Sequence, residues 1–483
     1  MKMVKRMIVM LLAVALVATP MTFTKIEKVS ADDFVITAPT NDKLLAAGHN
    51  DLKWNAKSGA KEYNIYMDGA LLATTKDTSY EFYSVKVNFH RAWIEAVMPD
   101  GSKYYTPTRR FTISKKGLGI DTTSYGGQHC YPWAFNLAWY YNWGRGPADE
   151  PAKSNGFGDI EYVHMAWNGR DVEGKVAEAK AAGCKYILGF NEPDGSSQAN
   201  MTVDTVVSLW PKLLNQGLYV GSPAYCEWPA ASEDGTQKAN EQFVEFFEKS
   251  GGKMDFICIH SYPWNWDGGS RMADYFVTRI KRAYEVYHKP IWLTEFSTSG
   301  EENHITEEGT RSFIEYLLPQ LDKLDCVERY AWFPTNRREV KQGLFWFGNG
   351  GLSVVGEEYA KQGNPNSYYA AGNLGNPADS GITYIAASIK VPGKTKIVSL
   401  KNIKKKTIKV KLKKANNANG YQIKYSTSKK FKKAKSMIST KVTFKVKKLK
   451  KKKYYFKARA YALNGKNKKY SAWSGKKSKK VKK

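Results

Sequence analysis

The stretch YILGFNEPDG, residues 186–195, is the best guide to the fold of the central part of this chain. Its first five residues are apolar or small and do not alternate with polar ones, which is typical of a parallel strand buried on both faces. The run ends on Asn191 and Glu192, followed by Pro193, which cannot donate to a strand ladder. Because an unpaired charge is costly to bury, this glutamate needs a partner or a chemical task.

Similar apolar runs recur along residues 115–362, with amphipathic stretches such as DVEGKVAEAKAAG (171–183) between them. The other runs are GLGID (117–121), NLAWYYNW (136–143), YVHMAWN (162–168), YVGSPAY (219–225), FICIHSY (256–262), IWLTEFS (291–297) and RYAWFPT (329–335). Eight buried strands that alternate with helices in roughly 250 residues predict an α/β fold, a (β/α)8 TIM barrel. An open doubly wound sheet is the alternative, but no glycine-rich phosphate loop follows the first run.

The segments on either side have the period-two alternation of antiparallel strands, so each is predicted to form a β-sandwich. Residues 36–114 resemble a fibronectin type III module in the Trp54 strand, in YNIYMDG (63–69) and in the closing FTIS (111–114). Residues 393–483 resemble one more strongly, through GYQIKYSTS (420–428), YYFKARAY (454–461) and YSAWS (470–474). Between the central segment and this second module, residues 363–392 are rich in Gly, Asn, Pro and Ser and predict a linker.

Residues 1–31 are predicted to be a signal peptide. Lys2, Lys5 and Arg6 precede the apolar run MIVMLLAVALVA (7–18), and VSA (29–31) offers small residues for cleavage. The run is short for a membrane span, although an uncleaved anchor is the alternative. The protein is therefore expected to be secreted or held at the cell surface.

The five cysteines are scattered singly, without the paired spacing of a metal site. We therefore expect no metal and no cofactor. An odd number leaves at least one thiol free, and the apolar neighbours of Cys258 predict that it is buried and inert.

The net charge of +30 is unevenly distributed. From residue 391 to the end the chain has 34 lysines, one arginine and no acid, whereas the rest has 40 basic and 45 acidic residues. Such a tail repels itself, which predicts an anionic partner such as an acidic polymer of the cell wall or envelope. A solvated face that only aids solubility is the alternative. Nucleic acid is not expected, because the strands lack an aromatic and basic stacking pattern.

The strand ends collect acids and aromatic side chains. Alternate residues of a strand share a face, so Glu192 is predicted in phase with Phe190, and Glu295 in phase with Leu293. In a barrel the carboxyl ends of the strands form the site, so both acids should meet at one rim. Two carboxylates in one cleft are what glycoside hydrolysis requires, and aromatic rings suit sugar faces. The alternative is that each acid pairs with an Arg or Lys at the same rim.

Five motifs strengthen this interpretation: YYNWG (140–144), GFNEPD (189–194), HSYPW (260–264), WLTEF (292–296) and AWFP (331–334). They resemble the catalytic barrels of glycoside hydrolase clan A, and their combination resembles glycoside hydrolase family 128, whose characterised members are β-1,3-glucanases. The resemblance covers the whole central segment. It implies a retaining, endo-acting enzyme that cleaves β-1,3-glucan without a metal.

By that resemblance Glu192 is the acid/base, with a raised pKa, and Glu295 is the nucleophile, the two carboxylates lying about 5–5.5 Å apart. Asn191 would bind the sugar 2-hydroxyl, His260 and Tyr262 would orient the nucleophile or the ring, and Trp332 would form the floor of the sugar site. The other candidate substrate-binding residues are Asn142, Trp143, Trp167, Tyr225 and Trp264. Trp292 is out of phase with Glu295 and is expected to pack under a helix.

Two other functions stay open. A relative in the same clan would cut another β-glycan, such as a mannan or a xylan. A non-catalytic adhesion protein would hold glycan without cleaving it, although the presence of both acids favours an enzyme. We expect a monomer in either case.

Overall fold

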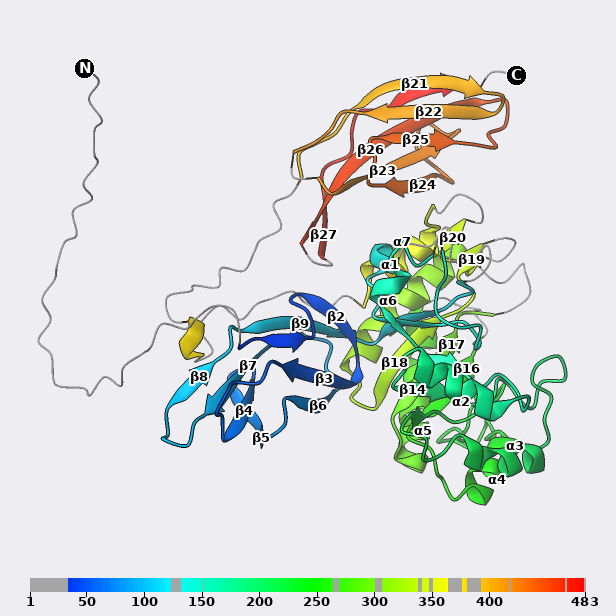
Figure 1. The fold of residues 1–483 in the computed structure, drawn as a ribbon. Coiled ribbons are helices and arrows are strands. Elements are labelled where there is room, and N and C mark those ends of the chain that lie inside the picture. Colours follow the sequence, from blue (N-terminus) through cyan, green and yellow to red (C-terminus); the bar gives the residue numbers. More distant parts are fainter. Residues whose placement is uncertain are drawn as a thin grey trace, which may run out of the picture.

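The structure is a computed structural model that describes residues 34–122, 132–150, 152–263, 269–299, 306–337, 341–346, 351–363, 376–379, 392–416, 418–464 and 467–481. The predicted signal peptide and Trp264 lie outside the described residues, as does most of the predicted linker. The chain forms an α/β domain with an all-β module on either side of it along the sequence (Figure 1). No helix in the described ranges has the length and apolar character needed to cross a membrane.

The N-terminal module consists of two sheets around one core. One sheet has the order β1-β3-β6 and the other β2-β9-β7-β4-β5, with β8 paired to β7. Leu52, Ile65 and Ile94 contribute to the core from both sheets, as the alternation predicts. The strands are β1 (Ile36–Ala38), β2 (Lys43–Ala46), β3 (Gly48–Trp54), β4 (Glu62–Met67), β5 (Ala70–Thr75), β6 (Ser79–Ser84), β7 (Phe89–Val97), β8 (Lys103–Tyr105) and β9 (Arg109–Ser114).

The central domain is built on parallel strands. They form a six-stranded sheet, β12-β11-β10-β18-β17-β16, and a three-stranded sheet, β13-β14-β15. A parallel bridge between Gly221 and Phe256 brings β15 next to β16. The strands are β10 (Lys116–Gly119), β11 (Trp139–Tyr141), β12 (Glu161–Tyr162), β13 (His164–Met165), β14 (Tyr186–Leu188), β15 (Tyr219–Val220), β16 (Ile257–Ser261), β17 (Ile291–Phe296) and β18 (Val327–Trp332).

Helices follow most of these strands and cover them from outside. They are α1 (Pro132–Phe135), α2 (Val172–Ala181), α3 (Val203–Leu209), α4 (Glu241–Lys249), α5 (Gly269–Tyr287), α6 (Glu307–Lys323) and α7 (Val354–Lys361). Helices α3, α4, α6 and α7 begin after Thr202, Asn240, Thr306 and Ser353, whose side chains accept a hydrogen bond from the backbone three residues on. The shorter elements are η1 (Phe157–Asp159), η2 (Trp210–Lys212), η3 (Pro377–Asp379), β19 (Asn336–Arg337) and β20 (Phe345–Trp346).

Two apolar layers lie on opposite sides of the parallel strands. Ile291 and Leu293 pack in the layer beneath the helices. Trp292 packs in the inner layer among the strands, where its ring stacks on Phe256 with centroids 4.1 Å apart. The expectation that Trp292 packs under a helix is therefore wrong.

A β-bulge explains this difference. In the pairing of β16 with β17, Ile259 lies opposite Leu293 but His260 lies opposite Glu295, so Thr294 is an extra residue. One inserted residue reverses the facing of everything after it. Glu295 therefore turns inward although Leu293 points to the helices, and the predicted shared phase of these two residues is wrong.

The N-terminal module covers the amino ends of the parallel strands. The fully buried Arg329 of β18 donates from Nε to the carbonyl oxygen of Ala47, and its two terminal nitrogens lie 2.8 and 3.2 Å from the carboxylate oxygens of Glu161. The guanidinium also lies 4.3 Å from the ring centroids of Tyr186 and Trp292. With this end covered, the carboxyl ends of the strands are left for a site.

The C-terminal module again has two sheets. Their orders are β21-β22-β25 and β24-β23-β26-β27, with β28 paired to β26. Ile408 and Val410 meet Ile423 and Phe456 in the shared core. The strands are β21 (Ile397–Lys404), β22 (Thr407–Leu412), β23 (Gly420–Ser426), β24 (Lys435–Ser439), β25 (Thr443–Val446), β26 (Lys453–Asn464), β27 (Asn467–Tyr470) and β28 (Lys477–Lys480).

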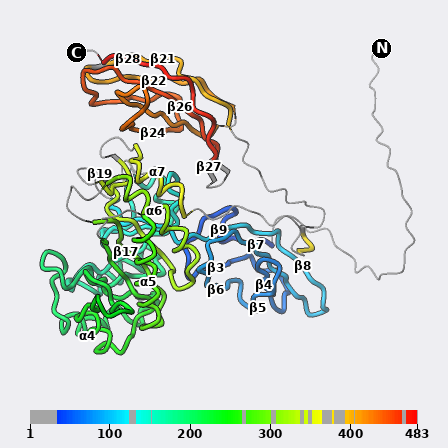
Figure 2. Tube along the Cα trace, turned by 180° about the vertical axis from the view of Figure 1, so that it is seen from behind, coloured from blue at the N-terminus to red at the C-terminus, as the bar shows by residue number. Residues whose placement is uncertain are grey.

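This module contacts the central domain at helix α7, on the side of β23 and β24 (Figure 2). Glu357 of α7 accepts hydrogen bonds from Lys424 Nζ at 3.2 Å and from Ser436 Oγ at 2.9 Å. The ring of Trp133 in α1 stacks on Tyr461 with centroids 5.9 Å apart. The second sheet, β21-β22-β25, therefore faces away from the central domain.

Candidate active site

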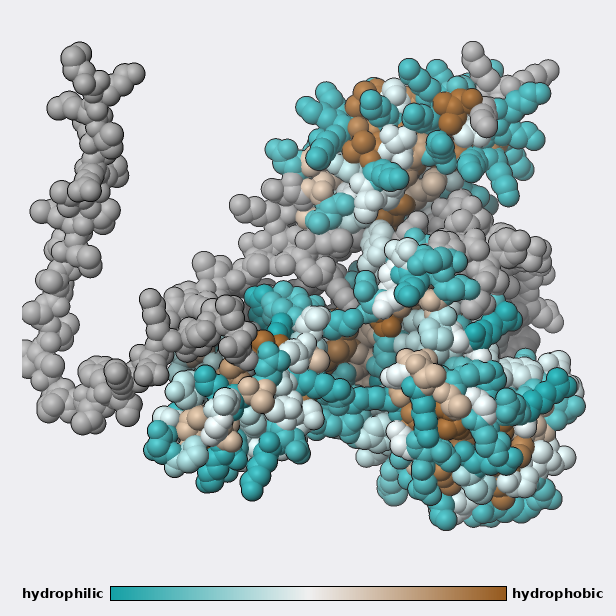
Figure 3. Space-filling model, in the orientation of Figure 1, coloured by the Kyte–Doolittle hydropathy of each residue, from teal (hydrophilic) through white to brown (hydrophobic). Residues whose placement is uncertain are grey.

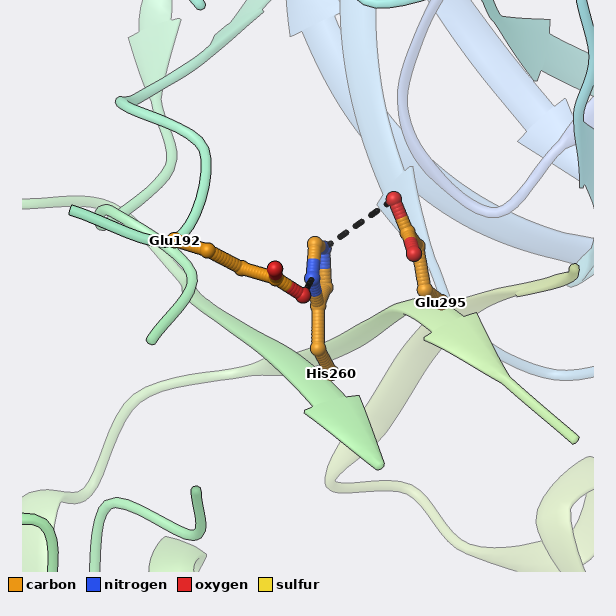
Figure 4. Close-up of side chains that lie close together, drawn as sticks. All are labelled: Glu192, His260 and Glu295. Atoms are coloured by element: carbon orange, nitrogen blue, oxygen red, sulfur yellow. Dashed lines mark hydrogen bonds and ion pairs between the residues drawn. The ribbon is translucent and has the colours of Figure 1, made fainter. Parts of the chain in front are cut away.

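Three ionisable side chains meet at the carboxyl ends of the parallel strands. His260 Nδ1 lies 2.8 Å from Glu192 Oε1, and His260 Nε2 lies 3.7 Å from Glu295 Oε1 (Figure 4). One potential ligand atom from each of the three residues lies within 4.8 Å of the others. His260 is 1% exposed and Glu295 5%, so the pair of acids brackets a buried imidazole.

The chain reaches Glu192 through a break in the strand. Leu188 faces the inner layer, but Phe190 packs outward against Trp210, so the predicted shared phase of Phe190 and Glu192 is wrong. Alternation fails at Gly189, where a Cβ would lie 2.8 Å from Pro223 N and 2.9 Å from Gly221 O. Only glycine allows the neighbouring loop to approach this closely.

Glu192 itself has a left-handed backbone conformation, with φ of 43°. Its N–H donates to the carbonyl oxygen of Ala224 at 2.7 Å, which ties the end of β14 to the chain after β15. A non-glycine residue with positive φ carries a conformational cost that surrounding structure must offset, and such residues concentrate at functional sites. The position of this carboxylate therefore depends on tertiary contacts.

Three donors hold the carboxylate of Glu295. Tyr141 Oη donates to Oε1 at 3.0 Å, Trp143 Nε1 donates to the same oxygen at 2.9 Å, and Tyr262 Oη donates to Oε2. Together they restrict rotation of the carboxylate. This arrangement suits a nucleophile that must present one oxygen to a fixed point.

The proton affinities of Glu192 and His260 are coupled. Burial alone would raise the pKa of Glu192, but the hydrogen bond and the positive charge of His260 outweigh it and leave the pKa lowered. Burial alone would lower the pKa of His260, but the negative charges of Glu295 and Glu192 leave it raised. The expectation of a raised pKa for Glu192 is therefore wrong for the ligand-free protein, where the neighbouring His260 lowers it.

An open cleft of about 350 Å³ lies over the two acids. Its lining residues are Trp143, Arg145, Trp167, Asn191, Glu192, Gln198, Glu295 and Phe333. Of the predicted substrate-binding residues, Trp143, Trp167 and Asn191 thus lie in the cleft, whereas His260 and Tyr262 act on the acids themselves. The indole of Trp143 and the ring of Phe333 pack edge to face with centroids 5.2 Å apart, which gives the cleft an aromatic wall.

Asn191 has one end of its amide fixed. Nδ2 donates to Gln198 Oε1 at 3.2 Å, and the backbone N–H donates to the carbonyl oxygen of Trp167 at 2.9 Å. Among the described residues, Oδ1 has no hydrogen-bond partner although it is buried. Because a buried polar atom without a partner is costly, Oδ1 is suited to accept a hydrogen bond from a ligand hydroxyl.

Asn142 does not reach the cleft. Its fully buried side chain donates to Thr122 Oγ1 and Gly146 O, and it accepts from Arg145 N and Tyr162 Oη. All of its polar atoms are thus used to hold the turn after β11. Asn142 therefore supports the loop that carries Trp143 and is not available to substrate, which corrects the sequence-based expectation.

Two aromatic candidates also lie elsewhere. Tyr225 is 2% exposed and packs edge to face against Phe243 of α4, because the preceding residue is the one that faces inward. Trp332 is fully buried beneath α7, where its ring lies 6.0 Å from that of Tyr359. The expectation that Trp332 forms the floor of the sugar site is wrong, and the next residue, Phe333, lines the cleft instead.

Four residues of the site did not figure among the candidates from sequence: Tyr141, Arg145, Gln198 and Phe333. Tyr141 had a usable signal, since it shares the inward face of Trp139 and Trp143. The others lie in loops or just after strand ends, where alternation gives no information.

Glu192, His260 and Glu295 also offer the oxygen and nitrogen atoms that metal ions use. Both Glu295 oxygens and His260 Nδ1 are, however, engaged by hydrogen bonds from within the protein. That pattern is typical of an acid–base site. The four described cysteines, Cys184, Cys226, Cys258 and Cys326, are free thiols, with Cys258 buried as predicted.

Comparison with known proteins agrees with this chemistry. Residues 124–359, which carry both acids and His260, match the family model described as "glycosyl hydrolase catalytic core". The protein is a glycoside hydrolase. No curated protein is similar enough to the hydrolase to count as a match.

Among solved structures, the hydrolase is similar to GH128 enzymes. A subgroup I endo-β-1,3-glucanase from Amycolatopsis mediterranei, in complex with laminaritriose, has 27% identity and a TM-score of 0.43, covering 51% of this chain and 99% of that one. A subgroup II endo-β-1,3-glucanase from Sorangium cellulosum has 24% identity and a TM-score of 0.43, covering 51% and 98%. A subgroup III curdlan-specific exo-β-1,3-glucanase from Blastomyces gilchristii has 29% identity and a TM-score of 0.39, covering 51% and 97%.

Proposed function

We propose that the hydrolase cleaves β-1,3-glucan with retention of configuration, using Glu192 as acid/base and Glu295 as nucleophile. The observation that carries this proposal is the short separation of the two acids: an oxygen of Glu192 lies within 4.8 Å of one of Glu295, over a shared cleft. Retaining enzymes separate their carboxyl groups by about 5–5.5 Å and inverting ones by about 6.5–9.5 Å, since inversion needs room for a water between the acid and the sugar.

In the first step Glu295 attacks the anomeric carbon, and the bond to the leaving O3 breaks as Glu192 donates a proton to that oxygen. In the second step water attacks the glycosyl-enzyme, Glu192 takes its proton, and Glu295 leaves. Tyr141, Trp143 and Tyr262 keep the Glu295 carboxylate aimed at the anomeric carbon throughout.

His260 has two effects on the acid. It donates from Nδ1 to Glu192 Oε1, so the proton that Glu192 delivers is carried on Oε2. Its positive charge also lowers the pKa of Glu192. A bound sugar that excludes water destabilises the ionised form of Glu192 relative to the neutral acid. The pKa of Glu192 therefore rises when substrate binds, which favours the protonated form that donates.

The choice of β-1,3-glucan rests on the motifs that resemble family 128. The cleft is compatible with a neutral glycan: Trp143, Trp167 and Phe333 offer apolar faces, and Asn191 Oδ1 offers an acceptor for a hydroxyl. The endo mode of action rests on the same resemblance.

Three structural and cellular features belong to the same proposal. Strand β10 pairs with both β11 and β18, and a bridge connects β15 to β16, so we take β10–β18 to be a (β/α)8 barrel of clan A type. We take the flanking modules to be fibronectin type III-like. Residues 1–31 would direct secretion of a monomeric enzyme.

A substrate panel with matched variants tests the proposal. The wild-type protein, Glu192→Gln, Glu295→Gln and the exposed control Glu233→Gln are compared on a linear β-1,3-glucan, a β-1,4-mannan and a β-1,4-xylan. We expect both site variants to lose at least about 1,000-fold in kcat on β-1,3-glucan and the control to lose nothing. Glucan binding without cleavage by the wild type would instead identify an adhesion protein, and preference for mannan or xylan would identify the related enzymes.

The stereochemical assignment has its own experiment. Proton NMR of the first products should show the β-anomer before mutarotation. Azide should rescue Glu295→Ala to give an α-glycosyl azide, and Glu192→Ala to give a β-glycosyl azide, because the azide takes the place of the missing carboxylate in each case. An α-anomer as first product would contradict the two-step mechanism.

A further inference from the structure

The outer sheet of the C-terminal module carries a row of lysines. Across β21-β22-β25, Lys401 lies opposite Lys409, and Lys409 lies opposite Lys445. Directly opposed side chains have Cβ atoms about 4.5–5.5 Å apart, a spacing at which like charges destabilise a sheet. Lys411, next on the same face of β22, extends the charge along the strand. We refer to Lys401, Lys409, Lys411 and Lys445 as the lysine face.

The lysine face has no counter-charge of its own. In the part of the chain that the structure describes, none of its four ammonium groups has an acidic side chain within ion-pair distance. No acid occurs anywhere from residue 391 onward. The part of the chain that the structure describes therefore leaves this charge without neutralisation.

In the inner sheet of the same module, two opposed lysines do have partners. Lys424 lies opposite Lys457 on β23 and β26, but both ammonium groups lie over the Trp473 ring, and Lys424 forms an ion pair with Glu357. That sheet docks on α7 of the central domain. The lysine face lies on the opposite side of the module. In Figure 3 the module shows many hydrophilic side chains with hydrophobic patches between them.

We propose that the lysine face is a docking surface for a polyanionic glycan, a carbohydrate polymer that carries phosphate or carboxylate groups. Charge complementarity selects an anion, because the face offers ammonium groups and no acid. A lysine ammonium group is a compact point charge, whereas the planar guanidinium of arginine presents its donors in a fixed geometry. Arginine is absent from these three strands. Such a surface suits a flexible, repeating polymer and not one rigid ligand.

The composition of the face argues against nucleic acid. Proteins that bind single strands place aromatic rings between basic side chains so that bases can stack on them. Ser399 and Thr443 lie opposite Lys411 on the two neighbouring strands, and neither is aromatic. This binding is independent of the hydrolytic mechanism, and it would hold the enzyme on an acidic envelope while the cleft works on neutral glucan.

The experiment compares two triple variants of the full chain. Lys401→Gln, Lys409→Gln and Lys445→Gln removes three charges from the lysine face, and Lys429→Gln, Lys430→Gln and Lys432→Gln removes three from the exposed loop after β23. The probes are poly(glycerol phosphate), polygalacturonate, neutral dextran, and single-stranded DNA of matched charge. Hydrolysis of a short neutral β-1,3-oligosaccharide reports that each variant is folded and active.

We expect the wild type to bind the phosphate or the carboxylate glycan and not dextran. The lysine-face variant should bind at least about tenfold more weakly, and its log–log salt dependence should be less steep by about two, because fewer counter-ions are released. The loop variant should stay near the wild type. An equal loss in both variants, no binding to either glycan, or tighter binding to DNA than to both glycans would overturn the proposal.

Discussion

His260 Nδ1 lies 2.8 Å from Glu192 Oε1, although 67 residues separate the two positions in the chain. His260 is fully enclosed, so its charge is not screened by water and acts directly on the acid. The pKa of Glu192 is lowered and that of His260 is raised. The pKa of the proposed acid/base is thus set by a neighbouring side chain and not by burial alone.

Replacement of His260 should move one limb of the pH profile. Glu192 must be protonated to act as an acid, so kcat/KM falls as pH rises through its pKa. His260→Asn keeps an amide donor but removes the positive charge, so the pKa of Glu192 should rise and the alkaline limb should move to higher pH. The pH dependence of kcat/KM on a soluble β-1,3-oligosaccharide measures this shift. Tyr316→Phe, on the exposed face of α6, is the control. An alkaline limb that stays at the same pH in His260→Asn would contradict the coupling.

Loss of either tyrosine beside Glu295 should slow the reaction without unfolding the protein. Tyr141→Phe and Tyr262→Phe each remove one hydrogen bond to a charged group, worth about 1.5–3 kcal/mol, or roughly 10- to 150-fold in kcat/KM. Steady-state kinetics together with thermal melting separate catalysis from folding. Tyr316→Phe, on the exposed face of α6, should change neither. Normal kinetics in both site variants would show that the Glu295 carboxylate needs no such positioning.

Substitution of Trp167 should mainly affect substrate binding, whereas substitution of Trp332 should mainly affect stability. Trp167→Ala removes a ring from the cleft wall, so KM for oligosaccharides should rise. Because Trp167 is only partly buried against the inner layer, the loss of stability should be smaller than in Trp332→Ala. Trp332→Ala leaves a cavity beneath α7 and should cost about 3–5 kcal/mol of unfolding free energy. Urea unfolding and KM measured on both variants make the comparison. A raised KM with little loss of stability in Trp332→Ala would instead show that Trp332 contacts the sugar.

Lys116 should make a contribution to stability that grows as the pH rises above neutrality. Burial lowers the pKa of this lysine to about 7 from an ordinary value of 10.5, and Nζ donates to Tyr359 O and Gln362 O. Between these two pH values the unfolded chain holds a proton that the folded chain has released. Unfolding therefore takes up a proton and becomes less favourable as pH rises.

Lys116→Met tests this by removing the titrating group at similar length. Urea unfolding at pH 7 and pH 9.5 should show a smaller gain in stability for the variant than for the wild type. A residual gain is expected from Lys115, whose pKa is lowered by burial to about 8. The exposed Lys61→Met serves as the control. If the unfolding free energy changes equally between pH 7 and pH 9.5 in the wild type and in Lys116→Met, Lys116 does not contribute to the pH dependence.

The contact between the N-terminal module and the central domain should be needed for stability. Arg329→Met leaves Glu161 and the carbonyl oxygen of Ala47 without their partner in a buried setting. Loss of one member of a buried pair typically costs about 3–5 kcal/mol. Because Glu161 keeps 28% of its side-chain surface exposed, we expect the low end of that range in urea unfolding. A loss near zero would show that Arg329 only fills space.

Sequence periodicity predicted the site well where strands run without interruption. The inward faces of Trp139, Tyr141 and Trp143, and of Phe256, Cys258 and His260, agree with simple alternation. Alternation failed for Glu295 because Thr294 is an extra residue in β17. It failed for Phe190 because the chain turns at Gly189 against the loop after β15. Such irregularities are set by neighbouring strands that lie far away in sequence.

The local order of polar and apolar residues is enough to predict the buried parallel strands and the alternating modules. It also places two glutamates at strand ends, and composition alone gives the excess of lysine. The tertiary structure, by contrast, packs Trp332 and Tyr225 beneath helices and uses Asn142 to hold the loop that carries Trp143. It also decided that His260 lowers the pKa of Glu192. Side-chain facing after a bulge and the charge around a buried acid depend on contacts between distant segments, which local order does not encode.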